Sequence, residues 1–157
     1  MSYHREWIVS SNAIMMVMSE SVALTFDKYA QNNFFKTEVG GILLGKRRHG
    51  HFEIVQVTTP TKFDKRTRNH WIRSDKIHAD IAKKAWQDSA GEISYLGEWH
   101  THPENNPTPS VIDIHEWSTI SNSCDNPAGL MMVIIGINDI WCGLSKKDSL
   151  TPLAKVD

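Results

Sequence analysis

The sequence predicts a single-domain α/β protein in which a mixed β-sheet packs against flanking α-helices. A chain of 157 residues suits one domain with an ordinary hydrophobic core. Segments rich in β-branched and aromatic residues alternate with segments of helical periodicity, which is typical of this class. The run at 130–137 is apolar throughout, as expected of a strand covered on both faces. The second strand expected after it, at 140–144, favours a mixed sheet.

The first third of the chain predicts two strands separated by a helix. Residues 6–9 indicate a short strand. Residues 10–12, two serines and an asparagine, are good N-cap residues and predict a long helix through about residue 31. Residues 38–45 then indicate an apolar strand whose glycines let another backbone approach closely.

A hairpin and an irregular segment follow. Residues 46–51 indicate an exposed turn that leads into a strand at 52–57. Residues 61–75 carry five basic and two acidic side chains and show no clear periodicity. One interpretation is a solvated loop. The other is a flap that grips a substrate, with Phe63 and Trp71 as apolar anchors.

Two further helices and a central strand are expected in the second half. A helix over residues 76–89 would end at Gly91, a good C-cap residue. A strand follows from residue 93, and three prolines then exclude regular structure until a third helix begins at Ser110. The residues of that helix expected to face the core are Ile114, Trp117 and Ser121.

Residues after Lys146 indicate a polar tail, so we expect one domain at 1–147 and a C-terminal tail at 148–157. The net charge of −1 gives no support to a nucleic-acid partner or a membrane surface. The longest apolar run is too short to span a bilayer, and the N-terminus lacks the layout of a signal peptide. Cys124 and Cys142 have no CxxC spacing, so we expect a reduced, cytoplasmic protein.

The stretch at 98–113 contains a candidate metal site. If the strand continues to His102, then His100 and His102 project from the same face, because side chains alternate along a strand. Their Cα atoms would lie roughly 6.6 Å apart, close enough for both imidazoles to bind one ion. Asp113, in the first turn of the next helix, would add a carboxylate. Two imidazoles, a carboxylate and an open position are the ligand set of a catalytic zinc site.

Each part of this site also has an ordinary interpretation. Ser110 and Asp113 fit a helix capping box. Glu38, at the head of an apolar strand, fits a solvated strand end. The combination of these parts is much rarer than any one of them.

The pattern of Glu38, His100-Thr101-His102, Ser110 and Asp113 resembles the JAMM (MPN+) metallopeptidase signature without a gap or substitution. The wider similarity, from Glu38 through Trp141, covers about two-thirds of the chain. The form His-Thr-His-Pro, followed by Pro-Thr-Pro-Ser, is similar to a small bacterial branch of this family. Members of that branch occur beside cGAS-like nucleotidyltransferases in the anti-phage operons called CBASS.

The resemblance implies an MPN/JAB fold, similar to that of cytidine deaminases, and a zinc-dependent, deubiquitinase-like isopeptidase or endopeptidase. It implies that His100, His102 and Asp113 bind Zn²⁺, that Glu38 is the general base and that Ser110 stabilises the oxyanion. The implied substrate is a protein, either one with a ubiquitin-like tail or a cGAS-like nucleotidyltransferase conjugated through its C-terminus. Removing that conjugate would restrain antiviral signalling.

Neighbouring residues are candidates for support of the site. Thr101 should point to the opposite face of the strand and is expected to be structural. Metal-binding imidazoles usually donate their second nitrogen to a partner. Glu104 and His115 lie near enough in the sequence to be considered for that contact.

Several alternative functions match part of this pattern. His102-Pro103-Glu104 matches the H-x-E of zinc deaminases, but the P-C-x-x-C that they require is missing. The helical H-E-x-x-H motif that would begin at His115 ends in threonine. Two histidines and a carboxylate also suit iron, but Glu38 and Ser110 would then be coincidental. Within the peptidases, the alternative is processing of a ubiquitin-like sulfur-carrier protein. In another class, the alternative is a non-catalytic MPN scaffold or binding module.

Overall fold

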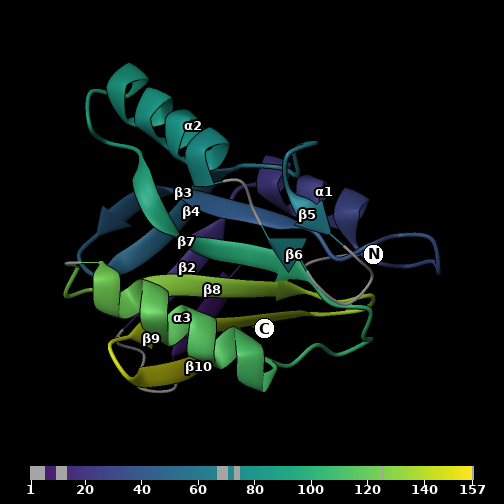
Figure 1. The fold of residues 1–157 in the computed structure, drawn as a ribbon. Helices are drawn as coiled ribbons and strands as arrows, with labels where there is room; N and C mark the ends of the chain where they lie inside the picture. The colour runs from purple at the N-terminus through teal and green to yellow at the C-terminus, as the bar shows by residue number, and fades with distance from the viewer. Residues whose placement is uncertain (1–5, 10–13, 67–70, 73–74, 125, 157) are drawn as a thin grey trace.

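The structure is a computed structural model, and it describes residues 6–9, 14–66, 71–72, 75–124 and 126–156 (Figure 1). The strands of its main sheet are β1 (Glu6–Val9), β2 (Met15–Met18), β3 (Gly40–Arg48), β4 (His51–Val57), β7 (Ser94–Thr101), β8 (Leu130–Ile135), β9 (Ile140–Lys146) and β10 (Ser149–Lys155). A separate antiparallel pair consists of β5 (Lys65–Arg66) and β6 (Trp71–Ile72). The described helices are α1 (Glu20–Tyr29), α2 (Asp75–Asp88) and α3 (Val111–Ser123).

The main sheet closes into a barrel with the strand order β1-β10-β9-β8-β7-β3-β4-β2. Its centre is mixed, because β7 pairs antiparallel with β3 but parallel with β8, and β8 pairs antiparallel with β9. The short strands β1 and β2 complete the barrel: β1 pairs with β10 and β2, and β2 runs parallel to β4. This mixed sheet with its packed helices confirms the predicted fold class.

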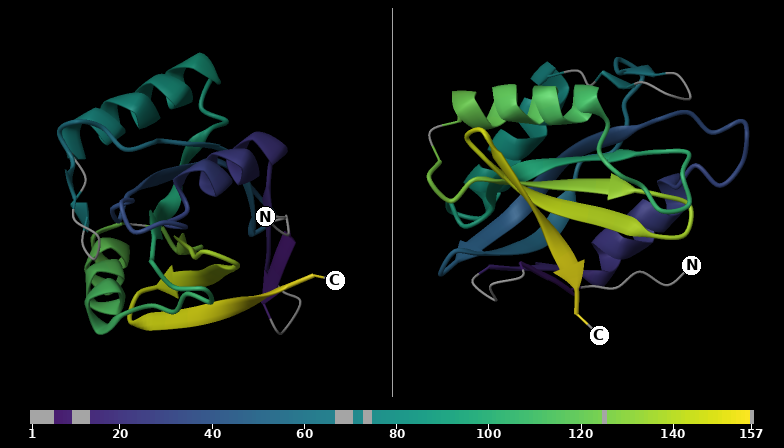
Figure 2. Two further views of the ribbon diagram at one scale, coloured as in Figure 1. Left: turned by 90° about the vertical axis from the view of Figure 1, so that its right-hand side faces the viewer. Right: turned by 90° about the horizontal axis from the view of Figure 1, so that it is seen from below.

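Strand β8 separates two hydrophobic clusters. The larger cluster contains Phe26 of α1. It also contains three residues of β8, which are Met131, Val133 and Ile135. The residues of β8 that pack with Trp117 of α3 are Leu130, Met132 and Ile134. Because side chains alternate along a strand, α1 and α3 lie on opposite faces of β8 (Figure 2). The continuous apolar run therefore reflects burial on both faces, as predicted.

The prediction of a long helix through about residue 31 is wrong for the first half of that segment. Residues 15–18 form β2, with Met16 and Met18 buried and Met15 and Val17 half-buried. This period-2 burial follows from pairing with β1 on one side and β4 on the other. Pairing with distant segments therefore overrides the local helical spacing of the methionines.

The helix therefore begins later in the chain than predicted, at Glu20. The predicted caps at 10–12 lie outside the described residues. The observed N-cap is Ser19, whose Oγ accepts a hydrogen bond from the N–H of Val22 at 3.4 Å. Helix α1 is consequently ten residues long.

The polar tail predicted at 148–157 is not observed, because these residues contain β10. Residues 149–153 of β10 pair with β9 and residues 153–155 pair with β1, so this strand is needed to close the barrel. Leu153 is its buried residue, and the other side chains of the strand are exposed or half-buried. This surface position explains why the composition resembles a tail.

The predicted turns agree more closely with the structure. The turn between β3 and β4 consists of His49 and Gly50, whose φ angles are 53° and 83°. Helix α2 ends as predicted, and the N–H of Gly91 donates to the carbonyl of Trp86 at 2.7 Å. The segment at 61–75 is not wholly irregular, since it contains β5 and β6. Among the described helices, none has the length and apolar content needed to cross a membrane.

Helix α3 buries a narrower face than predicted. Trp117 and Ser121 are buried as expected, whereas Ile114 is 45% exposed. The ring of Trp117 stacks on Trp141 with centroids 5.6 Å apart. The hydroxyls of Ser121 and Ser145 lie 2.6 Å apart. Helix α3 therefore packs on the sheet through its middle and its C-terminal end. Its first turn carries Asp113.

Candidate metal centre

Strands β3 and β7 bring distant parts of the chain together. Gly40 lies opposite His100 in the antiparallel register. A Cβ at Gly40 would meet the carbonyl oxygen of Trp99 at 2.2 Å, so this close approach requires glycine. Glu38 lies two residues before the first residue of β3. As a result, the potential ligand atoms of Glu38, His100 and His102 all lie within 4.8 Å of one another.

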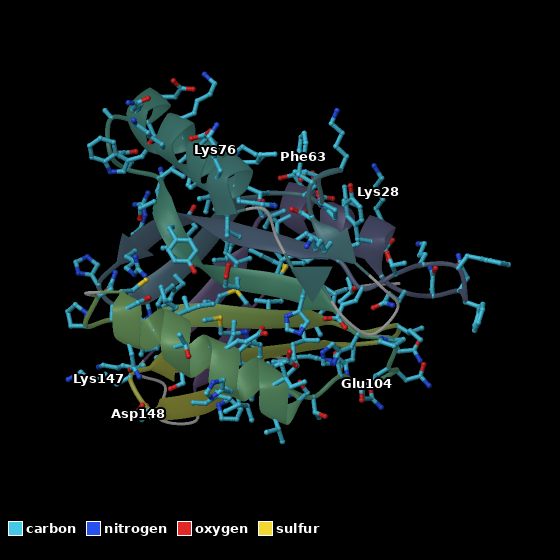
Figure 3. All side chains as sticks on the ribbon, in the orientation of Figure 1. Lys28, Phe63, Lys76, Glu104, Lys147 and Asp148 are labelled. Atoms are coloured by element: carbon cyan, nitrogen blue, oxygen red, sulfur yellow. The ribbon has the colours of Figure 1, made fainter. Side chains whose placement is uncertain are left out.

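His102 lies just past the end of β7. Its backbone N–H donates to the carbonyl of Ile135 at 3.0 Å, which extends the pairing with β8 by one residue. The Nδ1 atom of His102 lies 2.7 Å from Oε1 of Glu104, a residue of the loop between β7 and α3 (Figure 3). This contact orients the ring so that Nε2 is directed at the other site residues.

The first turn of α3 supplies Asp113. Its backbone N–H donates to Oγ of Ser110 at 3.0 Å, and its Oδ2 accepts the N–H of Ser110 at 2.8 Å. These two bonds are the capping box that the sequence indicates. The same carboxylate lies 3.3 Å from Nε2 of His100 and 3.1 Å from Nε2 of His102. One side chain therefore both caps the helix and faces the imidazoles.

The arrangement of these donor atoms fits a small divalent cation. The Nε2 atoms of His100 and His102 lie 3.0 Å apart. Neighbouring donors on a tetrahedral zinc ion, with bonds of about 2.0–2.1 Å, would be roughly 3.3–3.4 Å apart. The separations among the two imidazoles and Asp113, 3.0–3.3 Å, are close to that spacing. The donor set could therefore hold a metal ion.

Burial and close contact shift the pKa values within the site. Glu38, His100, His102 and Asp113 are all buried. Burial raises the pKa of Asp113, but hydrogen bonds from the two imidazoles outweigh it and hold that pKa well below its usual range. Burial lowers the pKa of His102, but contacts with Asp113 and Glu104 raise it above its ordinary value. Asp113 is therefore ionised at neutral pH, as a metal ligand must be.

Thr101 secures the segment that carries Glu38. Its N–H donates to the carbonyl of Val39 at 2.8 Å, and its hydroxyl oxygen accepts the N–H of Val39 at 3.0 Å. The hydroxyl also donates to Oε1 of Gln31 at 2.9 Å. These contacts agree with the structural role expected for Thr101. No sequence signal marks Gln31, because it becomes a partner only through the fold.

The structure does not bring every candidate to this centre. His115 is exposed on α3, whereas Glu104 contacts His102. Phe63, which is 63% exposed, lies far from Glu104 in Figure 3. The side chain of Trp71 lies outside what the structure describes. The interpretation of Phe63 and Trp71 as substrate anchors stays a prediction.

Exposed apolar side chains lie beside the site residues in the sequence. Phe34 and Phe35 precede Glu38 and are 78% and 90% exposed. Their rings are T-shaped, with centroids 6.0 Å apart. Val111 and Ile112, between Ser110 and Asp113, are 85% and 60% exposed. Sequence periodicity does not separate these surface residues from core residues, since both are apolar.

The family described as prokaryotic homologs of the JAB domain matches residues 20–143. Three curated relatives carry the name "CD-NTase/cGAS isopeptidase". The one from Pseudomonas aeruginosa is 37% identical over 144 residues, covering 92% of this chain and 91% of the relative. The one from Escherichia coli is 38% identical and covers 90% and 88%, and the one from Vibrio cholerae is 31% identical and covers 94% and 92%.

A solved structure supports the fold independently. The solution structure of a protein from Desulfitobacterium hafniense superposes with a TM-score of 0.63. The match covers 88% of this chain and 89% of that protein, at 20% sequence identity. At this identity the likeness concerns the fold alone.

Proposed function

Because this chain belongs to the family of prokaryotic JAB-domain proteins, we propose that it is a metal-dependent isopeptidase. The proposed substrate is a cGAS-like nucleotidyltransferase joined through its C-terminus to an amine of another protein. The names of the relatives, together with their identity over most of the chain, support this choice. The proposed setting is antiviral defence in the bacterial cytoplasm.

The observation that carries the proposal is the buried group of Glu38, His100 and His102, with Asp113 beside the two imidazoles. We propose that His100, His102 and Asp113 hold a zinc ion. Bound there, zinc would supply a Lewis acid and lower the pKa of a water molecule to about 7. Glu104 would keep the ring of His102 in the orientation that binding requires.

Glu38 is the proposed general base. Its carboxylate is buried and lies within 4.8 Å of both imidazoles. It would accept a proton from the attacking water and later deliver it to the departing amine. A positioned base of this kind contributes roughly 10²–10⁴ to the rate.

Ser110 is the proposed donor to the substrate carbonyl. Its Oγ accepts the N–H of Asp113, which leaves the hydroxyl proton to be donated. Among the described residues no acceptor for that proton is observed, and Ser110 adjoins the ligand-bearing first turn of α3. The hydroxyl would donate to the carbonyl oxygen as negative charge develops, a contact worth about 3–4 kcal/mol in comparable sites.

The exposed apolar side chains beside the site favour a protein as the substrate. Phe34 and Phe35 precede the proposed base, and Val111 and Ile112 precede the proposed ligand Asp113. Aromatic side chains are enriched at surfaces that bind proteins, so exposed ones next to the site residues in the sequence favour such a surface.

The decisive experiment incubates the purified protein with a nucleotidyltransferase fused at its C-terminus to a reporter. Parallel samples carry ubiquitin and sulfur-carrier fusions, each with and without a chelator. Chelator-sensitive release of the reporter from the nucleotidyltransferase fusion supports the proposal. Release from the sulfur-carrier fusion alone would replace the proposed substrate, and binding without cleavage of any fusion would indicate a scaffold. The matched control is Glu38→Gln, which keeps the shape of the side chain but cannot take up the proton.

A further inference from the structure

A second buried polar chain lies outside the candidate metal centre and consists of Asp64, His78 and Thr58. The Nε2 atom of His78 lies 3.2 Å from Oδ1 and 3.3 Å from Oδ2 of Asp64. Its Nδ1 atom lies 2.6 Å from Oγ1 of Thr58. The exposed fractions of Thr58, His78 and Asp64 are 2%, 0% and 8%. The order resembles that of a nucleophile, a base and a carboxylate, but no substrate could reach a threonine buried to this degree.

The hydrogen bonds around Thr58 favour one donor direction along this chain. Oγ1 of Thr58 accepts the N–H of Ile42 at 2.8 Å. The hydroxyl proton of Thr58 is then best donated to Nδ1 of His78, and Nε2–H of His78 donates to Asp64. In this tautomer, the Thr58 hydroxyl and Nε2–H of His78 each meet an acceptor.

One end of the chain is attached to the strands that carry the metal centre. The backbone N–H of Thr58 donates to the carbonyl of Ile42 at 3.0 Å, and its carbonyl accepts the indole N–H of Trp99 at 2.9 Å. Trp99 adjoins His100 in β7, and a Cβ at Gly41 would meet the carbonyl oxygen of Thr58 at 2.1 Å. Thr58 is therefore held against β3 and β7, the two strands that lead to the site.

The other end is attached to the root of β5. Asp64 directly precedes β5, and its carboxylate accepts the N–H of Thr61 at 2.9 Å and the hydroxyl of Thr61 at 3.1 Å. The pair β5–β6 lies between α2 and α3, on the same side of the sheet as α3 (Figures 1 and 2). His78, on α2, joins this root to Thr58.

We propose that His78, anchored on α2, holds the β5–β6 pair in place for substrate binding through its contact with Asp64, and that Thr58 sets the tautomer of His78 that donates to Asp64. The chain acts on affinity for the protein substrate, because its contacts reach the root of β5 and involve none of the proposed metal ligands. This inference rests on the proposed function for its kinetic consequence. The physical linkage itself is independent of any activity.

Two substitutions of His78 separate the linkage from simple packing. Asn places an amide oxygen where Nδ1 was, so His78→Asn keeps an acceptor for Thr58 and loses the contact with Asp64. Gln places its amide where Nε2 was, so His78→Gln keeps a donor for Asp64 and loses the acceptor for Thr58. Both variants remove the ring. The matched control is His49→Asn, at an exposed turn residue whose φ of 53° suits asparagine.

The first measurement is amide hydrogen exchange at Thr61 and Asp64. Loss of one supporting hydrogen bond should accelerate exchange about tenfold in His78→Asn. His78→Gln and His49→Asn should exchange like the unmodified protein at these amides. Equal exchange in the Asn and Gln variants at position 78 would overturn the linkage, because only the packing of the ring would then matter.

The second measurement is cleavage of the nucleotidyltransferase fusion, together with metal content. His78→Asn should raise KM about tenfold while kcat and metal content stay within twofold of the unmodified protein, and His78→Gln should keep KM near its original value. A fall in kcat or metal content without a change in KM would contradict the proposed role in substrate binding. If the unmodified protein cleaves no fusion, the proposed function fails, and the exchange comparison alone then decides the linkage.

Discussion

The Oδ2 atom of Asp113 lies 3.1 Å from Nε2 of His102 while it also accepts the backbone N–H of Ser110 at 2.8 Å. Helix capping and the proposed ligation therefore use one carboxylate. This arrangement fixes the position of the proposed ligand through the first turn of α3. It also means that substitutions can separate the two roles.

Asp113→Asn should lose metal while keeping most of the cap, because the amide oxygen can still accept the N–H of Ser110 but carries no charge. Asp113→Ala should lose both, with a further cost of about 1 kcal/mol in stability of the metal-free protein. Metal analysis and thermal unfolding of the metal-free variants check this. Stoichiometric metal in the Asn variant would show that Asp113 is not a ligand.

Glu38→Gln should retain stoichiometric metal and lose cleavage of the fusion by about 10²–10⁴-fold, because Glu38 is proposed to move protons without binding the ion. The comparison of metal content with turnover is the test. Loss of metal in this variant would instead identify Glu38 as a ligand.

Glu104→Gln should weaken metal affinity about 10–100-fold, since the charged partner of Nδ1 in His102 is removed. The control is His115→Gln, at an exposed position of the following helix. Competition with a chromogenic chelator measures both variants. Equal affinity in the two would mean that the 2.7 Å contact does not support the ring.

Metal affinity should fall as the pH is lowered, because protons compete with the metal for Nε2 of His102. The pKa of His102 in the metal-free protein is raised above its ordinary value. Release should therefore begin at a higher pH than an unperturbed histidine, with a pKa of about 6.5, would allow. A metal titration at several pH values checks the direction, and pH-independent affinity between pH 5 and 8 would contradict it.

Gly40→Ala should destabilise the protein, because the new Cβ would meet the carbonyl oxygen of Trp99 at 2.2 Å and force β3 away from β7. Overpacking of this kind costs about 1–3 kcal/mol. Thermal unfolding measures the loss. An unchanged Tm would show that the two strands can separate without cost.

Local sequence pattern was sufficient for much of this protein. The apolar run of β8 predicted burial on both faces, and Ser110 predicted the start of α3. The resemblance carried by Glu38, His100-Thr101-His102, Ser110 and Asp113 predicted the family, which the comparisons confirm. These features depend on residues that are close together or on a fixed motif order, so they can be recognised without knowledge of the fold.

Tertiary structure decided the remainder. Residues 15–18 have helical spacing but form a strand, because β1 and β4 offer backbone partners on both sides. Residues 149–155 have a polar composition but close the barrel, because one buried leucine and a ladder of backbone hydrogen bonds are enough at that position. Backbone pairing with distant strands carries no local signature, since every residue type except proline offers the same donor and acceptor.

The support of the site was decided in the same way. Gln31 reaches Thr101, and His78 joins Thr58 to Asp64, across separations that no spacing rule connects. By itself, the sequence determined which residues carry the candidate chemistry. Only the fold determined which side chains hold them in place, because a buried polar group takes whichever partner the packed chain brings within hydrogen-bonding distance.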